Sequence, residues 1–156
     1  MMCTCRYVSI NIVFCLFLSC MKHLYFRNSF VSIYYDKEQL LGKAVWHGEL
    51  FGSEFREAVL LCLDLIERHG LRGWLGDNRK MRSIHPNDQA WSVKVFVPQL
   101  MDSPLLRLAN IASESEQNRK AVDVMYNKAS NLTEKLVVRE FYGEAEAATW
   151  LRELVN

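Results

Sequence analysis

The order in which strand-like and helical segments follow one another most constrains the fold of this chain. Three short apolar stretches come first, at residues 24–27, 31–35 and 40–46, and brief polar spacers separate them. Such spacing is typical of an antiparallel meander. A helical period follows at residues 53–69, where Phe55, Val59 and Cys62 begin one apolar face at positions i, i+4 and i+7.

Strands and helices then alternate to the end of the chain. Strand-like stretches are expected at residues 71–76, 105–112 and 136–142, and helices at residues 86–101, 114–129 and 144–155. Successive strand–helix units imply parallel pairing through right-handed crossovers. The sequence therefore predicts an α/β fold with a mixed sheet, in which an N-terminal antiparallel meander precedes the strand–helix units.

Local signals indicate where the helices begin and end. Ser53 is a good N-cap for the first helix, and His69-Gly70 supplies its C-terminal stop. Pro98 removes one backbone hydrogen bond from the second helix, so that helix is expected either to kink there or to end near Val97. Trp150 lies on the apolar stripe of the last helix and is expected to anchor this helix to the sheet.

The length and the net charge of the chain limit the number of domains and the kinds of partner that can be expected. The chain has 156 residues, which suits a single domain, and the pattern places that domain at residues 21–156. Lys and Arg number 19 against 18 Asp and Glu, so no basic field would attract nucleic acid. Cys62 is the only cysteine beyond residue 20, which favours a reducing, cytoplasmic location.

Residues 1–20 differ in composition from the rest of the chain. They hold four of the five cysteines and an apolar run at residues 8–18, which is too short for a transmembrane helix of about 20 apolar residues. One interpretation is that translation starts at Met21 and the segment is an upstream artefact. The other is a signal-like segment, in which case the protein is exported or, through Cys20, lipid-anchored.

Several short motifs, taken together, resemble the STAS-like proteins of the anti-sigma-factor-antagonist superfamily. The resemblance covers residues 24–154. The motifs that carry it are Trp46-x-Gly48, Phe55-Arg56, Gly70-Leu71-Arg72-x-Trp74-Leu75-x-Asp77-x-Arg79, Pro86-x-Asp88-Gln89-x-Trp91, Pro98 and Leu106-Arg107-Leu108-Ala109. The resemblance implies about four helices packed mainly on one face of the sheet.

The resemblance also implies a non-enzymatic regulatory or protein-interaction module. The best-known members carry an Asp-Ser-Gly turn whose serine receives phosphate. That turn is absent here, because the corresponding segment reads Asp77 to Pro86 with His85 just before the proline. The expected partner is another protein with an acidic or phosphorylated surface. The alternative is a protein that binds a small apolar or anionic ligand between sheet and helices, as related lipid-transfer-like folds would imply.

The segment from Asp77 to His85 is the predicted recognition loop. A strand end, a cationic run and a helix N-terminus meet there, and such a combination suits an anion. The candidate residues are Asp77, Arg79, Lys80, Arg82, Ser83 and His85. The plainer interpretation is a solvated loop in which Asp77 pairs with Arg79 or caps a turn.

The residues that catalysis or cofactor binding would need do not form recognisable patterns. The four histidines have no second ligand at helical spacing, so no metal site is predicted. The seven glycines are dispersed and form no phosphate-binding loop, and Cys62 is placed for packing. We therefore expect no cofactor and no enzyme activity, and we expect the tryptophans to pack in the core.

Overall fold

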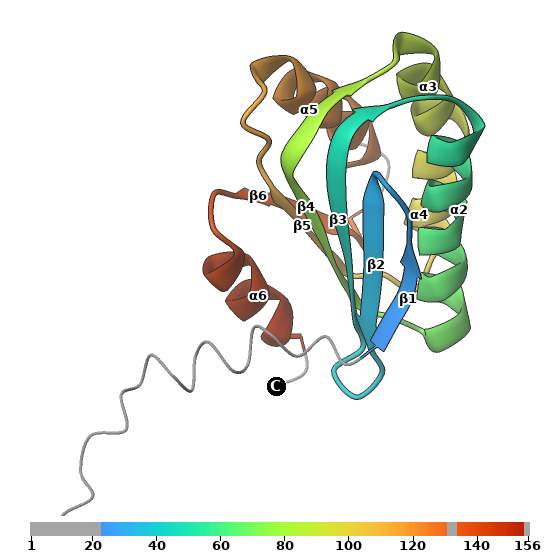
Figure 1. Cartoon of the computed structure of the whole chain (residues 1–156). Coiled ribbons are helices and arrows are strands. Elements are labelled where there is room, and N and C mark those ends of the chain that lie inside the picture. The colour runs from blue at the N-terminus through green and yellow to red at the C-terminus, as the bar shows by residue number, and fades with distance from the viewer. Residues whose placement is uncertain (1–22, 131–133, 155–156) are drawn as a thin grey trace, which may run out of the picture.

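The computed structural model describes residues 23–130 and 134–154 and confirms the α/β fold with a mixed sheet (Figure 1). The predicted leader at residues 1–20 lies outside the described residues. No helix within the described ranges is long and apolar enough to cross a membrane.

The six strands lie in the sheet in the order in which they occur along the chain. They are β1 (His23–Arg27), β2 (Val31–Asp36), β3 (Leu41–Leu50), β4 (Gly73–Ile84), β5 (Arg107–Ile111) and β6 (Val137–Phe141). The pairs β1–β2 and β2–β3 are antiparallel, and the pairs β3–β4, β4–β5 and β5–β6 are parallel. The predicted meander and the predicted parallel units are therefore both present.

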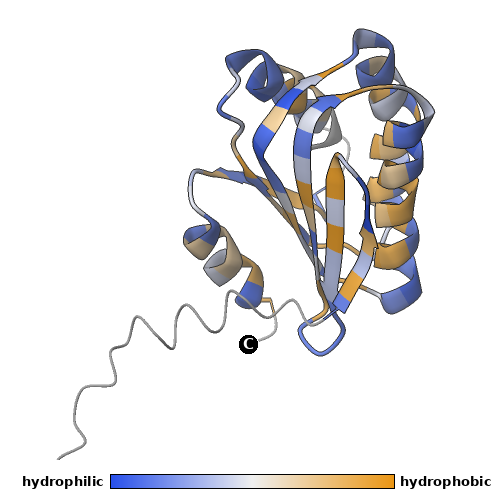
Figure 2. Cartoon of the chain, viewed as in Figure 1, coloured by the Kyte–Doolittle hydropathy of each residue, from blue (hydrophilic) through white to orange (hydrophobic). Residues whose placement is uncertain are grey.

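The helices cover the two faces of the sheet unequally. They are α2 (Gly52–His69), α3 (Pro86–Trp91), the π-helical η1 (Ser92–Phe96), α4 (Val97–Asp102), α5 (Glu116–Ser130) and α6 (Glu144–Arg152). The larger core cluster joins one face of the sheet to α2, α4 and α5, whereas a smaller cluster joins the opposite face to α6. Figure 1 shows α2 and α6 on opposite sides of the sheet, and Figure 2 shows apolar residues concentrated along β2 and α2.

The start of α2 corrects the prediction that Ser53 caps this helix. The N-cap position is Phe51, and its side chain makes no capping hydrogen bond. The cap comes from a distant helix, because the Asp88 carboxylate of α3 accepts a hydrogen bond of 2.9 Å from the Gly52 N–H. The end of α2 agrees with the prediction. Gly70 adopts a left-handed conformation with φ of 58° there.

The helical segment around Pro98 neither ends at Val97 nor continues as a regular α-helix. Residues 86–102 remain helical throughout, but the turn before Pro98 is π-helical. The Val97 N–H donates to the Ser92 carbonyl five residues earlier, instead of to a carbonyl four residues earlier. Pro98 has no N–H to donate, and the wider turn accommodates this missing hydrogen bond.

Strand β4 is much longer than expected and includes the segment predicted to be a recognition loop. The prediction placed a strand at residues 71–76 and a loop from Asp77 to His85, but β4 runs to Ile84. The extension pairs with the far half of β3 through registers such as His47↔Lys80 and Leu50↔Ile84, with two bulges. This pairing supplies backbone hydrogen bonds to a polar run that has no strand-like pattern of its own.

Candidate functional site

Asp77 and Arg79 form an ion pair, as the plainer sequence interpretation proposed. The Arg79 guanidinium donates to both Asp77 carboxylate oxygens, at 2.9 and 2.7 Å. The same guanidinium lies 3.3 Å from Glu144, the first residue of α6, and Glu144 also pairs with Lys43. Asp77 is only 5% exposed. These contacts occupy Arg79 within the protein and connect α6 to the sheet.

The other predicted recognition residues lie apart from this ion pair. Lys80 and Arg82 are exposed on β4, and in the described part of the chain no hydrogen bond or ion pair reaches either side chain. Ser83 is half-buried. His85 is exposed and caps α3, since its Nδ1 accepts a hydrogen bond of 3.3 Å from the Asn87 N–H. Only Lys80 and Arg82 therefore remain as cations open to a partner on this strand.

The pKa of Asp77 lies below the ordinary carboxyl value of 3.8. Burial alone would raise this pKa. The hydrogen bonds from the Arg79 side chain and backbone lower it, as do the charges of Arg79 and Lys43, and together they outweigh the effect of burial. The ionised carboxylate is thus favoured in the folded state. Its stabilising contribution is complete above the ordinary pKa and is lost as the pH falls through the lowered value.

We expect Asp77→Asn to lower the free energy of unfolding by about 1–2 kcal/mol at pH 7, an amount reduced by the partial exposure of Arg79. The difference from the wild type should be smaller near pH 3, because the carboxylate starts to be protonated as the pH falls below the ordinary value. Urea unfolding of both proteins at the two pH values measures it. Glu114→Gln, at an exposed acidic position, is the matched control and should show no such change. A difference independent of pH would contradict the role assigned to this carboxylate.

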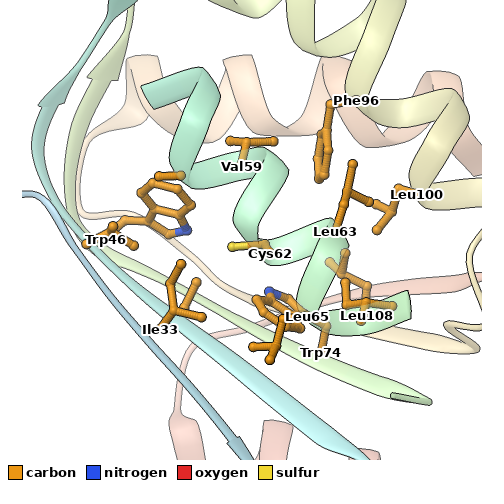
Figure 3. Close-up of a cluster of buried hydrophobic side chains, with 14 of the residues drawn as sticks. Ile33, Trp46, Val59, Cys62, Leu63, Leu65, Trp74, Phe96, Leu100 and Leu108 are labelled. Atoms are coloured by element: carbon orange, nitrogen blue, oxygen red, sulfur yellow. The ribbon is translucent and has the colours of Figure 1, made fainter. Parts of the chain in front are cut away.

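A cavity of about 60 Å³ lies in the larger core, between the sheet and helices α2, η1, α4 and α5. Its walls are mostly aromatic and aliphatic side chains. They include Trp46, Phe55, Val59, Cys62, Trp74, Met81, Phe96, Leu100, Leu108, Met125 and Tyr126. Figure 3 shows the indoles of Trp46 and Trp74 between the sheet and α2, with the Cys62 sulfur pointing toward Trp46. Trp46 and Trp74 are buried as predicted, whereas Trp91 and Trp150 are only half-buried.

Two asparagines line the cavity together with the hydroxyl-bearing residues Ser92 and Tyr126. Asn78 on β4 is 6% exposed, and Asn110 on β5 is 5% exposed. Among the residues that the structure describes, neither side-chain amide has a hydrogen-bond partner. Gly76 lies beside both, and a Cβ placed on it would lie 2.9 Å from Asn110 Oδ1 and 3.9 Å from Asn78 Nδ2. The absence of a side chain at Gly76 thus lets the Asn110 amide lie close against the β4 backbone.

A third asparagine lies on the helix that closes this side of the cavity. Asn118 of α5 is fully buried, and neither its Oδ1 nor its Nδ2 has a hydrogen-bond partner in the described ranges. It lies one helical turn before Val122, which lines the cavity. Buried amides are nearly always hydrogen-bonded in folded proteins, so the two unpartnered amides in the cavity wall need an explanation.

Among the described residues, no charged side chain lines the cavity, and the two titratable residues in its wall are Cys62 and Tyr126. Burial raises the pKa of the Cys62 thiol. Burial also raises the pKa of the Tyr126 hydroxyl, and the nearby Cys62 adds to this effect. Both groups are therefore neutral at physiological pH, and the cavity suits an uncharged occupant.

Asn78 and Asn110 are not among the site residues that the sequence predicts. Asn110 lies between the apolar residues Ala109 and Ile111, and this polar interruption is the one signal for it in the sequence. Asn78 lay in the segment predicted to be a loop, where an asparagine is ordinary. Both become notable only because parallel pairing of β4 and β5 places Gly76 opposite Asn110 in the core.

The fold and the cavity together define a mixed α/β protein with a largely apolar internal pocket. The described residues contain no group of three or more His, Cys, Asp or Glu side chains that could hold a metal ion. Comparison of the chain with protein-family models, with curated proteins and with solved structures finds no match.

Proposed function

We propose that this chain is a non-enzymatic protein that binds a small, mainly apolar molecule in the cavity between the sheet and helices α2, η1, α4 and α5. The observation that carries the proposal is the pair Asn78 and Asn110, whose residues are buried and line an apolar cavity, and whose amides have no hydrogen-bond partner among residues 23–130 and 134–154. A buried polar group left unsatisfied costs about 1–3 kcal/mol. A ligand that hydrogen-bonds these amides would offset that cost.

The composition of the wall supports this function. Ligand pockets are mostly apolar and aromatic, with a small number of convergent polar groups that orient the ligand. Here Trp46, Trp74 and Phe96 supply aromatic surface, and the two asparagines supply the polar groups. The resemblance to STAS-like regulatory modules suggests that a partner protein senses the occupied state. The lone domain cysteine, Cys62, is buried, which supports a cytoplasmic setting as part of this proposal.

A thermal-shift screen with neutral small molecules tests ligand binding. A compound present at ten times its Kd stabilises the folded state by about 1.4 kcal/mol, which raises Tm by about 3–6 °C in a chain of this size. We expect such compounds to stabilise the wild type and not Gly76→Ala, because the added methyl group would lie 2.9 Å from Asn110 Oδ1 and displace that amide from its position in the cavity wall.

The matched control for this screen is Gly143→Ala, where an added Cβ meets nothing within 4 Å and the backbone has no positive φ. This variant should respond to the same compounds as the wild type does. Equal stabilisation of Gly76→Ala and the wild type would place binding elsewhere. A screen in which no compound raises Tm would contradict the proposed function.

A protein-interaction function is the second candidate, and the exposed cations Lys80 and Arg82 favour it. Arg79 is not counted as part of this surface, because its guanidinium is paired with Asp77 and Glu144. An acidic or phosphorylated partner should be captured by the immobilised wild type and lost with Lys80→Ala/Arg82→Ala, and capture should weaken as salt rises. The double variant should keep its unfolding free energy, since exposed charges contribute little. Recovery of the same protein by both baits would exclude this surface.

A further inference from the structure

Resting on the proposed function, we infer that the ligand is a small neutral molecule whose polar end both donates and accepts hydrogen bonds, as a cyclic or primary amide does. This end would contact Asn78 and Asn110 beside Gly76. The apolar remainder would lie against the aromatic and methionine side chains of the same cavity.

The charge of the wall excludes ions as the preferred ligand. In the part of the chain that the structure describes, no Lys, Arg, His, Asp or Glu side chain lines the cavity. An anion or a cation placed there would lose its hydration without gaining a counter-charge, which is far more costly than burying a neutral polar group. The ligand is therefore uncharged where it meets the protein.

The two asparagines determine which hydrogen bonds the ligand must make. Asn110 Oδ1 and Asn78 Nδ2 both lie near the position that a side chain on Gly76 would occupy, at 2.9 and 3.9 Å from its Cβ. An acceptor and a donor therefore face the same small space. In the orientations that the structure has, Asn110 presents its acceptor oxygen and Asn78 its donor nitrogen toward this position. A group with both an N–H and a C=O matches the pair.

The volume of the cavity limits the size of the ligand. A buried water needs about 10–15 Å³ of such space, so a cavity of about 60 Å³ suits a molecule of a few non-hydrogen atoms. Met81 and Met125 lie in its wall. Methionine side chains are unbranched and repack easily, so the wall can adapt to a small ring.

A series of small ring compounds tests this inference in the full-length protein. The neutral probes are 2-pyrrolidinone, which donates and accepts, cyclopentanone, which only accepts, and methylcyclopentane, which does neither. Protonated pyrrolidine and cyclobutanecarboxylate supply the charged probes. Titrations followed by ¹H–¹⁵N spectra report on the Asn78 and Asn110 amides and the Trp46 and Trp74 indoles, all of which line the cavity. The indole of Trp150 on α6 serves as an internal reference.

We expect 2-pyrrolidinone to shift the cavity signals and both charged probes to bind at least tenfold more weakly. In Asn110→Leu, the affinity for 2-pyrrolidinone relative to methylcyclopentane should fall at least tenfold, which corresponds to about 1.4 kcal/mol. Asn78→Leu provides a second variant with the same expected loss. The matched control is Asn87→Leu, at an exposed position outside the cavity, and it should behave as the wild type does.

The probe titrations distinguish a wrong ligand class from a wrong binding function. If neutral probes bind and neither leucine variant in the cavity changes their relative affinities, the inferred ligand class is wrong and the binding function stands. If a charged probe binds as tightly as 2-pyrrolidinone does, the inferred ligand class is also wrong and the binding function stands. If no probe perturbs the cavity signals, only water binds to the two asparagines. Both the inferred ligand class and the proposed function are then wrong.

Discussion

Leu151→Ala is expected to lower the free energy of unfolding by about 2–5 kcal/mol, the range measured for buried leucines replaced by alanine. Leu151 is 1% exposed and belongs to the smaller core cluster, in which α6 meets the sheet. The helix approaches the sheet closely because Gly73 has no side chain. A Cβ at Gly73 would lie 3.3 Å from Leu151 Cδ2 and 2.5 Å from Leu41 Cδ2. A cavity left by Leu151 would therefore open directly between α6 and the middle of the sheet.

Chemical denaturation of Leu151→Ala, with Trp150→Ala beside it, measures this effect. The sequence predicted Trp150 as the anchor of the last helix, but its side chain is only half-buried. It packs on Phe141 with ring centroids 5.5 Å apart and lies under Arg107 at 4.8 Å. We expect Trp150→Ala to cost less than Leu151→Ala. A larger cost for Trp150→Ala would show that the indole is the anchor after all.

Asp88→Ala is expected to lower the free energy of unfolding by about 2–4 kcal/mol. The substitution is in α3, but it removes the cap of α2. Asp88 is 2% exposed, and its carboxylate accepts hydrogen bonds from the Gly52 N–H and from Arg56 Nε at 2.9 and 2.8 Å. Hydrogen bonds to a charged group contribute about 1.5–3 kcal/mol. The Arg56 side chain is 38% exposed and can be solvated when the carboxylate is removed. Its hydrogen bond to Asp88 therefore contributes less to stability than the hydrogen bond from the Gly52 N–H does.

Two further substitutions separate the cap from general effects of removing an aspartate. Asp88→Asn keeps an oxygen acceptor for the Gly52 N–H but loses the charge, and its unfolding free energy should lie between those of the wild type and Asp88→Ala. Asp123→Ala, at an exposed position of α5, should change stability by no more than about 0.5 kcal/mol. Equal stabilities for Asp88→Ala and Asp123→Ala would contradict the capping role.

Periodicity in the sequence determined most of the architecture, because short-range patterns encode which side of each element is buried. The meander, α2, the alternating units and the stop at Gly70 follow from residues within about 18 positions of one another. The mixed sheet follows from the same patterns, since consecutive strand–helix units pair in parallel. The ion pair of Asp77 and Arg79 is likewise a local feature, two residues apart on β4.

Tertiary structure alone decided the features that depend on residues distant in the chain. The far half of β4 is a strand because β3 pairs with it, and α2 is capped by Asp88, which lies 36 positions after Gly52. The candidate site belongs to this second group. Asn78 and Asn110 are ordinary residues in the sequence, and only the pairing of β4 with β5 places both amides beside one cavity. A linear pattern records the polarity of each residue, whereas hydrogen-bond satisfaction depends on neighbours that only the folded chain brings together.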